Sequence, residues 1–122
     1  MSMNQFILTS ESDITVTEFT ELLNNCPHLS NITRHDFMNH RMPVTQFECN
    51  AQFGLFDSEI CTLTIDTQDY NGETIIISVA IECADDNRIL DLPSVFKPLL
   101  NINWFKGSLN INNPIVIPIR GW

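Results

Sequence analysis

Apolar and polar residues alternate most regularly in the middle of the chain. Within residues 45–55 the side chains of Phe47, Cys49, Ala51, Phe53 and Leu55 point one way and polar side chains point the other. This two-residue period is typical of a half-buried β-strand. Asp57 and Ser58 then supply turn chemistry, and the alternation resumes at Cys61, Leu63 and Ile65. We therefore predict a hairpin of two strands.

A further strand is expected over residues 74–83, and the turn before it admits two registers. A two-residue Asn71-Gly72 turn sets Ile65 opposite Ser78, an apolar residue against a polar one. A three-residue loop of Tyr70, Asn71 and Gly72, with Gly72 left-handed, instead sets Ile65 opposite Ile77. We predict the three-residue loop. Apolar residues on both faces of residues 74–83 indicate a central strand.

Helical signals are clearest near the N-terminus, after a short apolar strand expected over residues 4–9. Thr15 and Glu18 have the spacing of a capping box, and Ile14 and Phe19 that of a hydrophobic staple. An apolar face at helical spacing follows, and Pro27 ends the helix.

The remaining segments are less regular. Residues 28–43 show no clean period and are predicted to be a long loop with a helical turn. Asp91 is expected to cap a helical stretch up to residue 102, which Pro98 breaks unless it opens a second short helix. Residues 109–119 are predicted to form a final hairpin around Asn112-Asn113-Pro114, with Pro114 and Pro118 on an edge strand.

These elements predict one α+β domain over residues 1–122. The expected order is β-α-β-β-β-α-β-β, with a mostly antiparallel sheet of five or six strands and two main helices. A hydrophobic content of 43% and a charged content of 17% are sufficient for a folded core.

Charge is the strongest indication of function. The formal net charge of −9 argues against nucleic acid as a direct partner, because phosphates would be repelled. Between Arg41 and Arg88 there is no Lys or Arg, and after Asp91 there is no acid. We predict that acidic residues of this middle stretch bind a basic protein partner: Asp57, Glu59, Asp66, Asp69, Glu73, Glu82, Asp85 and Asp86.

Motifs for catalysis are missing. The four glycines form neither a Gly-x-Ser-x-Gly elbow nor a phosphate-binding loop. Cys26, His28, His35, Asp36 and His40 are the best candidates for a metal or a thiolate–imidazole pair, but the spacing favours a solvated loop. Asp85 and Asp86 fit turn chemistry better than acid–base catalysis. We expect no catalytic residues, metal or cofactor.

The expected compartment follows from cysteines and hydropathy. Cys26, Cys49, Cys61 and Cys83 lack the close spacing of metal and redox motifs, and are expected to be buried free thiols in a reducing cytoplasm. No signal peptide or membrane-spanning run is visible.

The leading hypothesis is a non-catalytic cytoplasmic protein of the bacterial immunity type, which neutralises a basic toxin domain such as a nuclease. One alternative is a dimeric adaptor or secretion chaperone. The run over residues 99–103, followed by Gly107 and Leu109, resembles the second half of type III secretion chaperones. That resemblance covers less than a third of the chain and implies a homodimer that carries a partner segment. A small metal- or ligand-binding domain is the other alternative.

Overall fold

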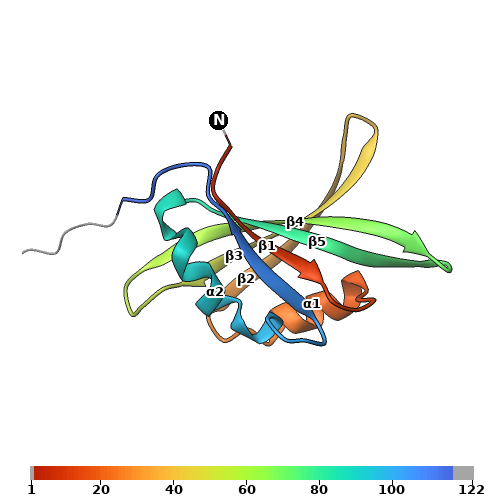
Figure 1. Ribbon diagram of the computed structural model, residues 1–122, viewed down its shortest axis with the longest axis horizontal. Helices are drawn as coiled ribbons and strands as arrows, with labels where there is room; N and C mark the ends of the chain where they lie inside the picture. The colour runs from red at the N-terminus through yellow and green to blue at the C-terminus, as the bar shows by residue number, and fades with distance from the viewer. Residues whose placement is uncertain (1, 117–122) are drawn as a thin grey trace, which may run out of the picture.

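The computed structural model describes residues 2–116, which form six strands, two α-helices and two short 3-10 helices (Figure 1). All six strands belong to one antiparallel sheet in the order β2-β3-β4-β5-β1-β6. The α+β class is therefore confirmed. The elements in chain order are β1 (Gln5–Ser10), α1 (Val16–Asn24), β2 (Leu29–Asn39), β3 (Met42–Gln52), β4 (Ser58–Tyr70), β5 (Glu73–Cys83), η1 (Asp86–Asp91), α2 (Leu92–Val95), η2 (Lys97–Leu99) and β6 (Phe105–Asn110).

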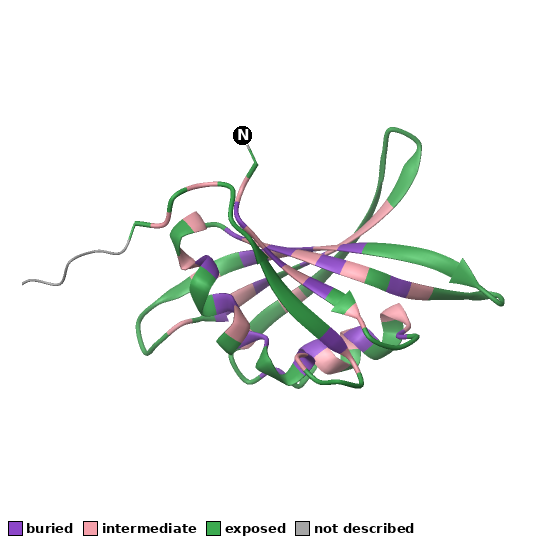
Figure 2. Ribbon diagram, in the orientation of Figure 1, coloured by how far each residue is buried: buried purple, intermediate pink, exposed green. Residues whose placement is uncertain are grey.

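The helices lie on one side of the sheet (Figure 1). Strand β5 pairs with β4 and β1 and is central, as predicted. The core fills the space between the sheet and the helices, and it alternates along the strands with more exposed positions (Figure 2). The largest fully buried side chains include Phe6, Phe19, Phe47, Phe96, Phe105, Leu8, Leu23, Leu63 and Ile81.

Helix α1 begins where the sequence predicts. The Thr15 hydroxyl accepts a hydrogen bond from the Glu18 N–H, and a Glu18 carboxylate oxygen accepts one from the Thr15 N–H, both at 3.1 Å. These bonds satisfy donors that the first helical turn leaves free. Phe19 then packs edge-on against Phe47 and Phe105, with ring centroids 5.7 and 5.6 Å away. The helix thus contacts β3, the strand next to one edge of the sheet, and β6, the strand at the other edge.

The prediction of a loop over residues 28–43 is wrong, because this segment is most of the β2–β3 hairpin. Strand β2 is an edge strand whose residues after Ile32 are all exposed. Without a buried side there is no selection for alternating polarity, so the sequence period is absent. The turn residues His40 and Arg41 have φ of 49° and 67°. The hairpin end extends away from the rest of the molecule (Figure 1).

The β3–β4 hairpin is confirmed, but its first strand ends earlier than the alternation suggests. Strand β3 ends at Gln52, Phe53 is only partly buried and Leu55 is 87% exposed in the connecting loop. The loop closes where the Phe53 N–H donates to the Asp57 carbonyl at 2.8 Å.

The predicted three-residue loop between β4 and β5 is also wrong. Tyr70 lies opposite Glu73, so the turn contains only Asn71 and Gly72, with φ of 50° and 80°. Two left-handed residues are the signature of a type I′ turn. The positive φ expected at Gly72 is confirmed.

A β-bulge, and not the length of the loop, places apolar residues of β4 opposite apolar residues of β5. Asp66 lies opposite Ser78 and Thr67 opposite Ile76, which leaves Ile77 as the extra residue. The bulge shifts the register so that Ile65 lies opposite Val79 instead of Ser78 or Ile77. Two-residue turn chemistry and apolar pairing are thereby both satisfied.

The helical stretch after β5 is divided into three short pieces. Asp85, not Asp91, caps the first of them: its carboxylate accepts the Asn87 N–H at 3.1 Å, whereas Asp91 makes no side-chain capping bond. Pro98 lies in the first turn of η2 and so opens a second short helix.

The expected final hairpin is not formed in the described part of the chain. Leu109 belongs to β6, which pairs with β1, and residues 111–116 contain no strand. Instead the side-chain oxygen of the buried Asn4 accepts the N–H groups of Asn112 and Asn113 at 2.6 and 2.7 Å. Ile117, Pro118 and Ile119, the rest of the predicted strand, lie outside the described residues.

Candidate functional site

The face of the sheet opposite the helices carries polar side chains in rows across the strands. We call this surface the open face. One row runs from Thr33 on β2 through Glu48 and Thr62 to Glu82 on β5. The next crosses all six strands through His35, Gln46, Thr64, Ala80, Ile7 and Ser108. The Gln46 amide donates to the Thr64 hydroxyl at 3.1 Å, which fixes two neighbours in this row.

Three carboxylates mark the open face. Glu48 and Glu82 flank Thr62 in one row, so about 10 Å separates their strands. Asp66 lies two rows further along β4, opposite Ser78. Each of these three acids is next in sequence to a buried residue that points to the core. Because neighbouring side chains of a strand point to opposite faces, the acid points to the open face. Within residues 2–116, none of these three carboxylates forms an ion pair or a side-chain hydrogen bond.

Asp66 and Glu82 were among the predicted partner-binding residues, and the structure brings them to one surface. Glu48 was not. Its signal was present in the sequence, because the alternation over residues 45–55 already turns Glu48 away from Phe47 and Cys49. The open face therefore joins acids from three neighbouring strands.

The other predicted acids lie elsewhere. Asp69 and Glu73 are near the tip of the β4–β5 hairpin, where residues 67–74 pair only within that hairpin and form an arm. Tyr70, at the tip, is 55% exposed. Asp69 accepts a hydrogen bond from the Thr74 hydroxyl at 2.9 Å. Glu73 lines a hollow of about 450 Å³ with Arg34 and the first residues of α1.

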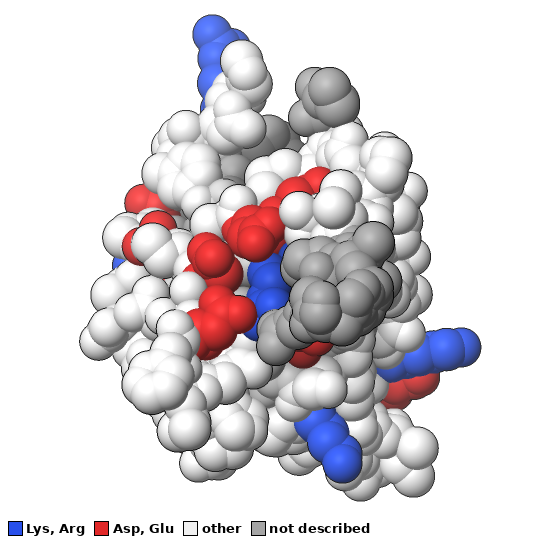
Figure 3. Space-filling view, turned by 90° about the vertical axis from the view of Figure 1, so that its left-hand side faces the viewer, with Lys and Arg blue, Asp and Glu red and all other residues white. Residues whose placement is uncertain are grey.

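Four of the predicted acids gather at the opposite end of β4, about 40 Å from the tip of the arm by the rise of an extended strand: Asp57, Glu59, Asp85 and Asp86. Figure 3 looks at this end of the molecule, where acidic atoms surround a basic group. Arg88 binds the Asp57 carboxylate at 2.5 Å and lies 3.4 Å from that of Asp91. Its guanidinium also covers the Phe53 ring at 4.5 Å. Part of the negative charge here is thus neutralised within the chain.

Asp85 and Asp86 contribute to the fold. Asp85 caps η1, and the Asp86 carboxylate accepts the Asn4 N–H at 2.7 Å and the Asn113 amide at 3.0 Å. Acids used in this way are less available to a partner than those of the open face.

The candidate metal or thiol–imidazole residues are not brought together. His35 lies on β2 near the Thr33 hydroxyl, and His40 lies at the hairpin turn. Asp36 accepts hydrogen bonds from Thr45 and Arg34, and these contacts lower its pKa. Among residues 2–116, no group of three acidic, His or Cys side chains is arranged to hold a metal ion.

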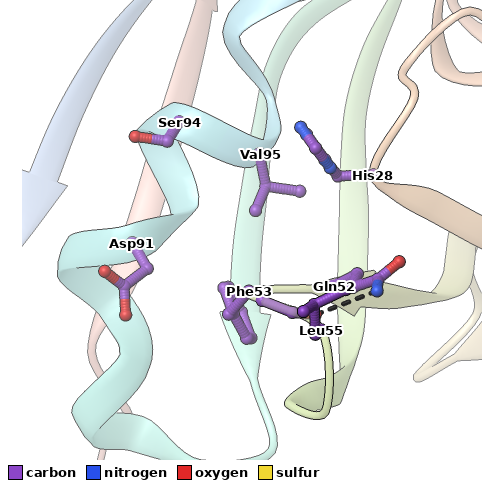
Figure 4. Close-up of a pocket in the computed structure, with 8 residues that line it drawn as sticks. His28, Gln52, Phe53, Leu55, Asp91, Ser94 and Val95 are labelled. Carbon is purple, nitrogen blue, oxygen red and sulfur yellow. Dashed lines mark hydrogen bonds between the residues drawn. The ribbon is translucent and has the colours of Figure 1, made fainter.

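His28 lies apart, in a hollow of about 530 Å³ between α2 and the β3–β4 loop (Figure 4). Ser94 and Asp91 also line this hollow, so the residue types of a catalytic triad are present. Ser94 points away from His28, however, and Asp91 is paired with Arg88. The Gln52 amide donates to the Gly54 carbonyl at 2.9 Å and shapes the loop.

The four cysteines are buried and unbridged, as expected. Cys49, Cys61 and Cys83 lie side by side on β3, β4 and β5. Burial raises the pKa of Cys26 to about 11 and that of Cys49 to about 12, which keeps both thiols protonated. A hydrogen bond with Cys83, together with burial, raises the pKa of Cys61. The row behaves as packing material for the core.

Comparison with family models, curated proteins and solved structures finds no match for this chain. No helix among the described residues has the length and apolar character needed to cross a membrane.

Proposed function

We propose that this protein is a non-catalytic inhibitor of the immunity type, whose open face binds a basic toxin domain, such as the phosphate-binding surface of a nuclease. The observation that carries this proposal is the set of carboxylates of Glu48, Asp66 and Glu82, which have no ion-pair partner among residues 2–116. Outward positions of β3 to β5 contribute no Lys or Arg to offset them. The remaining positions offer hydroxyls and amides that suit an extended polar interface.

Electrostatics give this surface a specific role. A cationic groove that binds phosphate presents Lys and Arg side chains at short intervals, and carboxylates at several points of a flat face can meet them together. The net charge of −9 extends the attraction beyond contact distance and accelerates encounter. Tyr70, which by strand alternation lies on the same side of the β4–β5 arm as Asp66, adds an exposed aromatic contact at the tip of the arm.

The test begins by isolating the basic partner from the source organism with the wild-type protein, followed by stopped-flow association at low and high salt. The variant Glu48→Lys/Asp66→Lys/Glu82→Lys should associate at least about tenfold more slowly at low salt, with a smaller effect at high salt. A matched control, Glu11→Lys/Asp13→Lys/Glu21→Lys, makes the same change of charge at exposed positions off the open face.

The control should remain within about twofold of wild type at matched ionic strength once the long-range contribution of net charge is screened. Substituting His28, His35 and His40 should matter little. Equal slowing by both triple variants at high salt, or a rate unaffected by either, would place the interface elsewhere.

A further inference from the structure

Strand β6 forms one edge of the sheet. Among residues 2–116, no strand pairs with the side of β6 that faces away from β1. The Glu11 N–H donates to the Trp104 carbonyl at 2.9 Å, which fixes the alternation of the ladder between these strands. By that alternation Lys106, Ser108 and Asn110 bond to β1, whereas Gly107 and Leu109 direct their N–H and C=O groups outward. Leu100 bridges only the start of the edge, at Phe105.

An apolar hollow of about 540 Å³ lies beside this edge on the helix side, lined by residues that include Phe6, Leu100, Phe105 and Leu109. Gly107 forms part of its wall, and a Cβ there would approach the Phe6 ring to 2.8 Å. Leu109 is 40% exposed and Ile102, on the rim, is 89% exposed. Exposed apolar residues next to free strand hydrogen bonds are features of a pairing site.

The other edge of the sheet is protected. Strand β2 is irregular between Ser30 and Thr33, where Asn31 has φ of 51°. Its outer half carries Arg34, His35 and Asp36. Irregular backbone and charged side chains are the usual defences of an edge strand, and β6 has only Lys106.

We propose that β6 pairs antiparallel with β6 of a second copy of this chain, so that two sheets become one continuous sheet. Two-fold symmetry about Ser108 sets Gly107 opposite Leu109 of the second copy, and both carry outward backbone groups. Each such pair exchanges hydrogen bonds, and each Leu109 side chain lies over the position where Gly107 has none, against the apolar hollow. One strand thus carries both a projecting side chain, Leu109, and a position without a side chain, Gly107. The same edge on two copies is therefore complementary to itself.

Charge also favours a second copy at this place. Two molecules with a net charge of −9 repel each other over most of their surface. The chain after Asp91 contains no acid, and Lys106 would face Asn110 of the second copy and not another lysine. The dimer is independent of the proposed open-face function.

The direct test is mass measurement by light scattering or sedimentation on the intact chain. The expected mass at high concentration is twice the 14.0 kDa of one chain. Leu109→Lys should shift the protein to monomer with an intact melting transition. Phe56→Lys, at a 99% exposed apolar residue of the β3–β4 loop, should remain dimeric and serves as the matched control.

The register has its own test. Ser108 and its symmetry mate form a non-hydrogen-bonded pair, in which opposed Cα atoms are about 4.5 Å apart and suited to a disulfide. Ser108→Cys should therefore give a reducible covalent dimer with oxidised glutathione, whereas Lys106→Cys and wild type should not.

The proposal is overturned by a wild-type protein that is monomeric at about 100 μM, where a dimer with a Kd of about 1 μM is nearly complete. Equal cross-linking of Ser108→Cys and Lys106→Cys, or a dimer that survives Leu109→Lys, overturns it as well.

Discussion

The backbone N–H of Asn4 donates a 2.7 Å hydrogen bond to the carboxylate of Asp86, across 82 positions of sequence. Asn4 is fully buried, and its side chain in turn holds the turn at Asn112 and Asn113. A single carboxylate therefore joins the N-terminal strand, η1 and the segment after β6.

Asp86→Ala should lower the free energy of unfolding by about 2–4 kcal/mol, because it leaves a buried N–H without an acceptor. Chemical denaturation monitored by circular dichroism measures the loss. Asp86→Asn, which retains one carbonyl oxygen, should lose less. Glu11→Ala, at an exposed acid, should stay within about 0.5 kcal/mol of wild type. An Asp86→Ala protein as stable as Glu11→Ala would contradict this role.

Gly72→Val should destabilise the β4–β5 hairpin by about 1 kcal/mol or more. Gly72 has φ of 80°, a conformation that costs a β-branched residue free energy. The control is Asn71→Gly, since Asn71 also has positive φ and glycine adopts it freely. Thermal melting compares the two, and an unchanged melting temperature for Gly72→Val would count against the type I′ turn.

Gly107→Ala should destabilise the protein by about 1–3 kcal/mol, because the added methyl overpacks the space above Phe6 and Leu100. In a Leu100→Ala background the Gly107→Ala change should cost less stability than it does in the wild-type background, because the shortened side chain at position 100 leaves room for the added methyl. Additive losses in the double-mutant cycle would show that the two positions are not in contact.

Stability should fall at alkaline pH. The pKa values of Cys26 and Cys49 are raised by burial from 9.0 to about 11 and about 12. The unfolded chain therefore loses these protons first, so the contribution is complete below pH 9 and is lost as the pH rises from there toward the folded-state values. Each thiol contributes at most about 1.4 kcal/mol per pH unit.

Urea unfolding under reducing conditions between about pH 8 and about pH 10.5 measures this slope. Cys26→Ala and Cys49→Ala should each show a shallower dependence on pH than wild type. Identical slopes in all three proteins would mean that other groups dominate.

Local signals in the sequence were sufficient for α1 and for the core sides of β3, β4 and β5. Thr15 and Glu18 fixed the start of α1, and alternation identified the core residues of β3, β4 and β5. Strand β2 carried no such signal because solvent surrounds most of it. The sequence does not predict the bulge at Ile77, because two features that are apart in sequence determine it together. One is the two-residue turn at Asn71 and Gly72, and the other is the pairing of Ile65 with Val79.

The candidate site was predictable only in part. Alternation places Asp66 and Glu82 on one face, but proximity in sequence wrongly grouped them with Asp86, whose role depends on Asn4. Likewise, the pairing of Asp57 with Arg88 depends on the β3–β4 loop meeting η1 in three dimensions. Charge in a sequence does not distinguish a carboxylate used by the fold from one left free.

The β3–β4 ladder ends at the pair of Thr45 and Ile65. Past that pair, residues 36–44 form ladder bonds only within the β2–β3 hairpin, and residues 67–74 only within the β4–β5 hairpin. Their ladder hydrogen bonds can therefore open without disturbing the core, and their backbone amides should exchange with deuterium long before those of β5. A partner bound to either hairpin end would slow the exchange of these amides, which is fast in the free protein. Deuterium uptake by these two segments is thus the most sensitive reporter of binding that the molecule offers.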